Sequence, residues 1–220
     1  MLEERLTIHA SVGPLAAFLA APDGWAGGPA VIVIQEWWGL NPNIESICWR
    51  FADEGFAALA PDLYRGELTT EPDEARKLMM QLDGPKAVED LRAGLSTLMD
   101  RGATKVGAMG FCMGGYLTHE LALREDRLGA AVACYGLTDP KGRALLAPMQ
   151  VHIGTEDDFD RADMQILAAT LASRRDGSEL FTYEGAPHAF MNDTRPEVYR
   201  PESAALAWER ATAFLHAKLG

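Results

Sequence analysis

The chain has 220 residues, of which 48% are hydrophobic and 24% are charged. This composition excludes an intrinsically disordered or membrane-embedded protein, and no apolar run approaches the roughly 18 residues of a membrane span. The net charge of −12 repels phosphate backbones and anionic lipids, so nucleic acids and membrane surfaces are poor candidate partners.

Apolar strand-like runs alternate with longer helical patterns along most of the chain. Residues 5–10 and 15–20 alternate weakly and are expected to pair as an antiparallel edge. Later strands are predicted at 30–36, 57–62, 105–110, 129–136, 149–154 and 178–183, and helices at 42–54, 72–81, 85–101, 114–125, 161–174 and 201–218. The later strands are apolar nearly throughout, which is typical of parallel strands covered on both faces. The sequence therefore predicts an α/β fold in one domain, residues 1–220, with a mostly parallel sheet flanked by helices on both faces.

Residues 110–115, GFCMGG, place Cys112 between an apolar strand and a helical pattern. The glycines two residues before and two residues after it have the spacing of the GxSxG nucleophile elbow, with sulfur in place of oxygen. Such a tight strand-to-helix turn strains its central residue and leaves room only for glycines at its flanks. The free N–H groups of the helix N-terminus can stabilise a thiolate or an oxyanion. Cys112 is therefore a candidate nucleophile.

The chain has three cysteines, which form no CxxC pair and leave an odd one. This arrangement argues against a disulfide framework and against a four-cysteine zinc site. Cys48 and Cys134 lack the setting of the elbow and are expected to be buried and inert. Glu3 and Glu4 precede the first apolar stretch, where a secretory signal would be basic. We therefore expect a cytoplasmic protein that holds no metal.

A cysteine that transfers acyl groups needs a base, and the base needs an acid that orients it. In open-sheet hydrolases the chain order is nucleophile, acid and histidine, each after a strand end. The acid position falls in residues 152–160, HIGTEDDFD. Asp157 is the favoured acid and Asp158 is the alternative, whereas Asp160 is typical of a helix N-cap. A calcium loop is excluded because the glycine and the bidentate glutamate of that motif are missing.

Five histidines could supply the base. His188, in GAPHAF, follows the last predicted strand and precedes the last predicted helix, which is the place that the chain order requires. His152 lies inside a predicted strand, His119 inside a predicted helix, and His9 and His216 near the ends of the chain. We therefore predict that His188 is the base.

Glu36 is an acid in an unexpected place. The strand predicted at 30–36 ends in this residue, and Trp37 and Trp38 follow it. A carboxylate at the carboxyl end of a strand lies where open α/β sheets hold their sites. On position alone, a site residue and a solvated loop end are equally good interpretations of Glu36.

With these residues in this order, the sequence resembles the dienelactone hydrolase family, carboxymethylenebutenolidases of the α/β-hydrolase fold. The segments QEWWGLN, APDLYRG, GFCMGG, CYG, GTEDDF and EGAPHAF are similar to that family's landmarks and follow its order over nearly the whole chain. The resemblance implies an α/β-hydrolase fold and hydrolysis without a cofactor.

The resemblance also implies roles for individual residues. It makes Cys112 the nucleophile, His188 the base and Asp157 the acid that orients the base. It assigns the oxyanion hole to the backbone N–H groups of Trp37 and Met113.

The same resemblance gives Glu36 the role of a gate that engages the resting thiol until substrate releases the sulfur toward the histidine. A nearby carboxylate opposes thiolate formation and protects an exposed sulfur from oxidation. The sequence departs from the family where substrate is bound, because Asn192 stands where well-characterised members carry an arginine that grips a substrate carboxylate. Those members also carry an arginine in the helical region around residues 71–83, for which Arg76 is the candidate substitute, and Arg65, Arg195 and Arg200 are other basic candidates.

We expect a hydrolase that cleaves a small ester or lactone through an acyl-thioester intermediate at Cys112. Two alternatives stay open: a thioesterase that uses the same triad, and a redox-responsive or ligand-binding protein without turnover. The sequence predicts neither the physiological substrate nor the oligomeric state.

Overall fold

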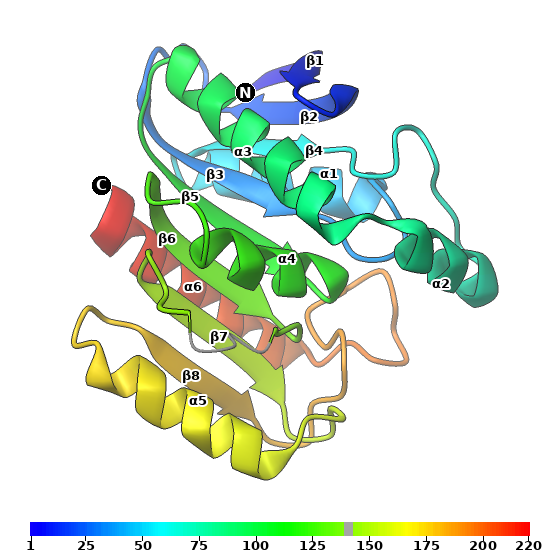
Figure 1. Cartoon of the computed structure of the whole chain (residues 1–220), viewed down its shortest axis with the longest axis vertical. Helices are drawn as coiled ribbons and strands as arrows, with labels where there is room; N and C mark the ends of the chain where they lie inside the picture. Colours follow the sequence, from blue (N-terminus) through cyan, green and yellow to red (C-terminus); the bar gives the residue numbers. More distant parts are fainter. Residues whose placement is uncertain (139–142) are drawn as a thin grey trace.

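The structure, a computed structural model, describes residues 1–138 and 143–220. Within these ranges eight strands form one sheet, in the order β1-β2-β4-β3-β5-β6-β7-β8 (Figure 1). In chain order the strands are β1 (Leu2–Ala10), β2 (Gly13–Ala21), β3 (Gly28–Ile34), β4 (Ala57–Pro61), β5 (Ala103–Phe111), β6 (Leu128–Cys134), β7 (Met149–Gly154) and β8 (Glu179–Tyr183).

The two strands at one edge of the sheet run antiparallel to their neighbours. β1 pairs antiparallel with β2, and β2 pairs antiparallel with β4, which confirms the predicted edge. All the pairs from β4 and β3 across to β7 and β8 are parallel. The carboxyl ends of these strands therefore meet at one edge of the sheet, where open α/β sheets bind their ligands.

The helices are α1 (Pro42–Asp53), α2 (Pro72–Gln81), α3 (Gly84–Asp100), α4 (Met113–Ala122), α5 (Arg161–Ser173) and α6 (Pro201–Leu219). Every predicted strand and helix is present, within three residues of its predicted ends. Asp160 caps α5 as predicted, because its carboxylate accepts hydrogen bonds from the backbone N–H groups of Ala162 and Asp163. None of the helices in the described part of the chain is both long enough and apolar enough to cross a membrane.

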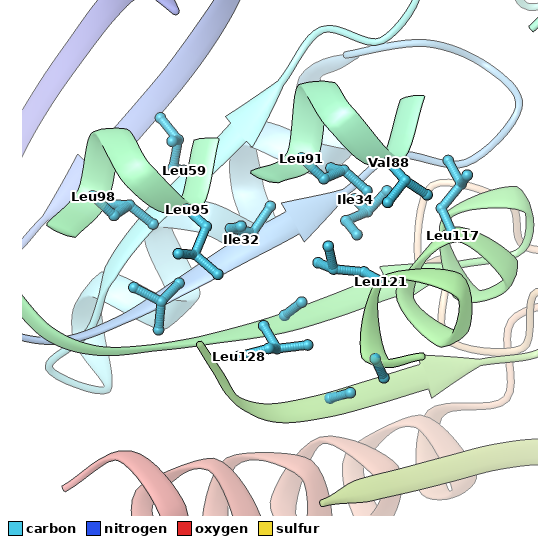
Figure 2. Packing of buried hydrophobic residues seen from close by; sticks show 14 of the residues in the cluster. Ile32, Ile34, Leu59, Val88, Leu91, Leu95, Leu98, Leu117, Leu121 and Leu128 are labelled. Atoms are coloured by element: carbon cyan, nitrogen blue, oxygen red, sulfur yellow. The ribbon is translucent and has the colours of Figure 1, made fainter. Parts of the chain in front are cut away.

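Helices cover both faces of the sheet, as predicted. Figure 1 shows α3, α4 and α5 on one face and α1 and α6 on the other. Side chains alternate along each strand and therefore contribute to two apolar clusters. In β3, Ile32 and Ile34 belong to the first cluster, and Val31 and Val33 belong to the second. Figure 2 shows the first cluster, in which aliphatic side chains of α3 and α4 meet those of the strands: Ile32, Ile34, Leu59, Val88, Leu91, Leu95, Leu98, Leu117, Leu121 and Leu128.

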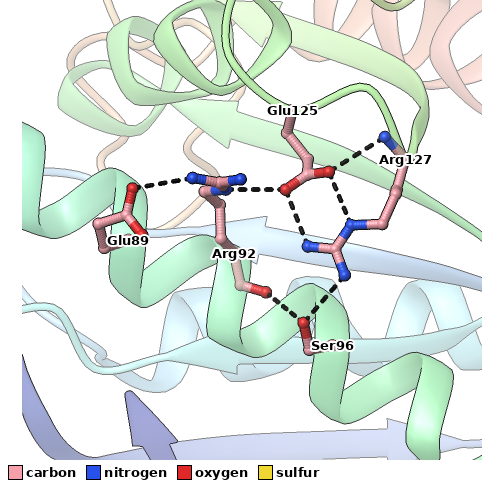
Figure 3. Close-up of polar contacts among 5 residues, drawn as sticks. All are labelled: Glu89, Arg92, Ser96, Glu125 and Arg127. Atoms are coloured by element: carbon pink, nitrogen blue, oxygen red, sulfur yellow. Dashed lines mark hydrogen bonds and ion pairs between the residues drawn. The ribbon is translucent and has the colours of Figure 1, made fainter. Parts of the chain in front are cut away.

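A polar network lies at the opposite edge of the sheet, where the parallel strands begin. Glu125, between α4 and β6, accepts hydrogen bonds from Arg92 Nε at 2.8 Å and from Arg127 Nε at 2.8 Å. Arg127 also donates to the Ser96 hydroxyl at 3.2 Å, so the network joins α3 to the segment that enters β6 (Figure 3).

Candidate active site

Cys112 forms a strained turn between β5 and α4, at the carboxyl edge of the parallel strands. Its backbone has φ 55° and ψ −116°, a conformation that side-chain-bearing residues rarely adopt. Its N–H donates to the carbonyl of Cys134 at 3.0 Å, and its carbonyl accepts from the N–H of Tyr116 at 3.1 Å. The turn is therefore held by backbone hydrogen bonds on both sides of the sulfur-bearing residue.

The glycines around this turn are required by close backbone contacts. A Cβ atom on Gly110 would lie 2.1 Å from the carbonyl oxygen of Gly114, and one on Gly114 would lie 2.3 Å from the carbonyl oxygen of Ile34. A Cβ atom on Gly136 would lie 1.9 Å from the carbonyl oxygen of Cys112. The spacing in GFCMGG predicts the first two constraints, whereas the constraint on Gly136 comes from a different strand end and has no local sequence signal.

The loops that follow β7 and β8 are joined at the same edge of the sheet. The N–H of Glu156 donates to the carbonyl of Ala186 at 3.0 Å, and the N–H of Gly185 donates to the Thr155 hydroxyl at 3.0 Å. A Cβ atom on Gly154 would lie 2.0 Å from the Ala186 carbonyl oxygen, so only glycine lets the two loops approach this closely. These contacts bring the acid-bearing loop and the histidine-bearing loop together.

His188 meets Asp157 in this paired-loop region. Its Nδ1 atom lies 3.0 Å from both carboxylate oxygens of Asp157. The alternative acid, Asp158, donates its backbone N–H to Asp157 Oδ1 at 3.0 Å. A carboxylate at Nδ1 fixes the imidazole orientation and stabilises its protonated form.

Cys112 lies close enough to His188 to raise the pKa of its ring, so the three predicted residues are brought together at one place. Burial of the ring lowers the pKa of His188, but the interactions with Asp157 and Cys112 outweigh it and raise that pKa above its ordinary value. Cys112 and His188 both line a cavity of about 200 Å³. This arrangement suits a thiolate paired with an imidazolium.

Glu36 lies two residues beyond the end of β3 and is 3% exposed. Its carboxylate accepts hydrogen bonds from Asn192 Nδ2 at 2.7 Å and from the Tyr135 hydroxyl at 3.4 Å. Burial raises the pKa of Glu36, although the hydrogen bond from Asn192 and the charge of His188 oppose the shift. Glu36 lines the same cavity as Cys112, and its burial excludes the solvated loop end that its position had left open.

Trp37 and Met113, the residues predicted to form the oxyanion hole, both lie beside the candidate nucleophile. Trp37 follows Glu36 in the loop after β3 and lines the cavity that Cys112 lines. Met113 directly follows Cys112 as the first residue of α4, so its N–H has no acceptor within the helix.

The predicted substrate-binding residues lie in three different places. Arg65 makes a two-point ion pair with Asp90, at 2.9 and 3.0 Å, and lies outside the lining of the cavity. Arg76 lies on α2 beside Asp73, in a separate surface hollow. Asn192 is buried and donates its amide to Glu36. The structure therefore brings only Asn192 to the immediate surroundings of the cavity.

Three residues in or beside the cavity have contacts that the sequence analysis did not predict. Tyr135 is buried, has φ 41°, and packs the edge of its ring on His188 at 5.2 Å between ring centroids. Arg195 and Met79 both line the cavity. Motifs could have suggested none of these contacts except that of Tyr135, which lies in the CYG landmark.

Known proteins share both the sequence pattern and the fold. The sequence pattern of the dienelactone hydrolase family matches residues 15–219. A candidate carboxymethylenebutenolidase of Aquifex aeolicus is 36% identical over 211 residues, which cover 90% of each chain. The protein named usf of Aquifex pyrophilus is 38% identical over 213 residues, again covering 90% of each chain.

A crystal structure of a candidate dienelactone hydrolase from Klebsiella pneumoniae superposes with a TM-score of 0.86 at 28% identity, covering 98% of each chain. Sequence and structure therefore agree over nearly the full length of the chain. The chain belongs to the dienelactone hydrolase family and is a carboxylic ester hydrolase with the α/β-hydrolase fold.

Proposed function

We propose that the protein hydrolyses a small ester or lactone with Cys112 as nucleophile, His188 as base and Asp157 as the acid that orients the base. The observation that carries this proposal is that one imidazole lies 3.0 Å from the Asp157 carboxylate and lines, together with Cys112, a cavity of about 200 Å³. A nucleophile, a base and an orienting group within hydrogen-bond reach are the requirement for acyl transfer. Relatives named as carboxymethylenebutenolidases support a lactone as one substrate class.

The reaction begins when the Cys112 thiolate attacks the carbonyl carbon of the ester. The negative charge then moves to the carbonyl oxygen, where the N–H groups of Trp37 and Met113 stabilise it. As the tetrahedral intermediate collapses, the carbon–oxygen bond of the ester breaks and the His188 imidazolium donates a proton to the departing alkoxide. The products of this half-reaction are an alcohol and an acyl-thioester on Cys112.

Water completes the cycle. His188, now neutral, accepts a proton from a water molecule that attacks the thioester carbonyl, and the second tetrahedral intermediate expels the Cys112 thiolate. The acid product leaves, and the thiolate–imidazolium pair is restored. In a lactone the alcohol and the acyl group belong to one molecule, so ring opening keeps both on the enzyme until this step.

Glu36 has a regulating role in this scheme. Its buried carboxylate lines the cavity that holds Cys112, and its hydrogen-bond donors, Asn192 and Tyr135, are neutral. A negative charge near the sulfur disfavours the thiolate. Glu36 would therefore limit thiolate formation in the resting enzyme and reduce its oxidation.

The test is substitution of the proposed triad. Cys112→Ala and His188→Ala should each lower kcat/KM on a panel of small esters and lactones by about 10³-fold or more, because both residues act in the same step. His9→Ala, which removes an exposed histidine far along the chain, is the matched control and should keep wild-type activity. Turnover at the wild-type rate by Cys112→Ala would refute the proposal.

A further inference from the structure

An apolar groove adjoins the Cys112 cavity. It lies between the end of α2, the start of α3 and the first turns of α4, and it is lined by Met79, Leu82, Gly84, Met113, Tyr116 and Leu117. Figure 1 shows α2 standing out from the body of the protein at the edge where the parallel strands end.

Two residues connect the groove to the reacting sulfur. Met79 lines both the groove and the Cys112 cavity, so a single flexible side chain separates them. Met113 follows Cys112 directly in the chain, and its side chain forms part of the groove. The Tyr64 hydroxyl donates to Met113 Sδ at 3.2 Å, which holds that side chain in place. The groove therefore starts within one residue of the nucleophile.

The volumes indicate that the cavity alone is too small for most ligands. The Cys112 cavity has about 200 Å³ and the groove about 250 Å³. Ligand pockets usually have about 300–1,000 Å³. Together with the adjoining groove, the site reaches this range.

The charges around the cavity disfavour an anionic ligand. Among the described residues that line it, Arg195 is the one arginine or lysine, and its guanidinium is paired with Glu197 at 2.7 Å. Glu36 adds a buried carboxyl group to the lining. Asn192 uses its amide to bind Glu36 rather than facing a ligand. No strong unpaired cation in the described lining is left to hold a substrate carboxylate.

Resting on the proposed function, we propose that the substrate is a neutral ester or lactone with an aliphatic arm, and that this arm lies in the groove beyond Met79. The ester carbonyl then lies at Cys112, and the arm runs between α2 and α4. Met79 determines how long an arm the enzyme accepts.

The experiment measures kcat/KM for a series of p-nitrophenyl esters from acetate to octanoate. For the wild-type protein we expect kcat/KM to rise by about two- to fourfold for each added methylene up to at least about six carbons, since each buried methylene adds binding free energy. Met79→Trp fills the junction between the groove and the cavity. It should lower the ratio of octanoate to acetate activity by about tenfold or more.

A second variant fills the groove away from the cysteine. Gly84 begins α3, its φ is not left-handed, and an added Cβ atom meets nothing within 4 Å, so Gly84→Leu adds its Cβ atom without a clash. It should lower the same ratio of octanoate to acetate activity. Met80→Trp is the matched control, because Met80 is 77% exposed on the same helix and lies outside the groove, and it should keep the wild-type ratio.

A pair of esters of equal length tests the charge of the substrate. We expect wild-type kcat/KM to be at least about tenfold higher for p-nitrophenyl hexanoate than for the mono-p-nitrophenyl ester of adipate, which carries a carboxylate at the end of the arm. A preference for the adipate half-ester would overturn the inference.

The groove inference and the proposed function fail in different ways. If acetate is hydrolysed in a Cys112-dependent manner but neither Met79→Trp nor Gly84→Leu changes the chain-length ratio, the groove inference is overturned and the proposed function stands. If ester hydrolysis persists in Cys112→Ala, both are overturned.

Discussion

Two glutamates are buried at opposite edges of the same sheet, and their partners are of opposite kinds. Glu36, at the carboxyl ends of the parallel strands, is 3% exposed and is bound by the neutral donors Asn192 and Tyr135. Glu125, at the edge where those strands begin, is 1% exposed and is bound by Arg92 and Arg127. The residue type and the low solvent exposure are the same, whereas the charge of the partners and the depth below the protein surface differ, because Glu125 lies beneath two partly exposed arginines.

The pKa values of the two glutamates are shifted in opposite directions. Burial raises the pKa of Glu36, because neutral donors compensate only part of the lost hydration. Hydrogen bonds from Arg127 and Arg92 lower the pKa of Glu125 to about 2, although burial opposes them. The edge with cations holds a permanently charged structural group, whereas the edge without them holds a carboxyl group whose charge can respond to its surroundings.

The largest effect is expected when the Glu125 network is removed. Glu125→Ala should lower the free energy of unfolding by about 2 kcal/mol, less than for a fully buried pair because the two arginines are partly exposed and return to water. Urea unfolding measures this loss. Ester hydrolysis by the folded variant should stay within about twofold of wild type, because Glu125 lies at the edge remote from Cys112.

A loss of kcat/KM of about tenfold or more in folded Glu125→Ala would contradict the comparison, since it would mean that the two edges of the sheet are coupled. Met80→Ala, at an exposed site, serves as the control for general effects of substitution on stability.

Glu36→Gln should change the reactivity of Cys112 and leave the stability of the protein nearly unchanged, in contrast to Glu125→Ala. Glutamine keeps an acceptor for Asn192 and removes a buried charge, so we expect the free energy of unfolding at pH 7 to stay within about 1 kcal/mol of wild type or to rise. The pH profile of iodoacetamide reaction at Cys112 should move to lower pH by about half to one unit, because a negative charge near the sulfur is gone. Mass spectrometry of the peptide that contains Cys112 measures the alkylated fraction at each pH.

The matched variant for this measurement is Glu125→Gln, which changes the same residue type at the other edge and should leave the alkylation profile in place. A profile that is identical in Glu36→Gln and wild type would show that Glu36 does not act on the sulfur.

The smallest effect concerns the pH dependence of stability. The pKa of Glu125 is lower in the folded state than in the unfolded state, so its contribution is complete above about pH 5 and is lost as the pH falls toward 2. The difference in unfolding free energy between wild type and Glu125→Gln should shrink to less than about half between pH 6 and pH 3. A difference that is constant over this range would contradict the ion-pair explanation.

Local sequence signals were sufficient for the fold and for the placement of three side chains. Gly110 in GFCMGG reflects a contact within the turn itself, and the order of Cys112, Asp157 and His188 follows from strand ends that parallel topology brings to one edge. Apolar runs reveal such strands because both of their faces are covered.

Partners of charged side chains could not be predicted in the same way. Arg65 pairs with Asp90 on α3, 25 residues away, and Arg195 pairs with its neighbour Glu197 instead of facing the cavity unpaired. The choice among carboxylates depends on side-chain placement in three dimensions, which no spacing in the sequence encodes. For the same reason the groove beside Met79 has no sequence signature.

The central claim is that acyl transfer proceeds through the sulfur of Cys112. Rapid quenching of wild-type protein with p-nitrophenyl hexanoate in acid, followed by peptide mass spectrometry, tests it most directly. The account predicts a hexanoyl group on the peptide that contains Cys112. A hexanoyl group on another side chain, or turnover of the ester with no acylated peptide in a burst-phase sample, would contradict it.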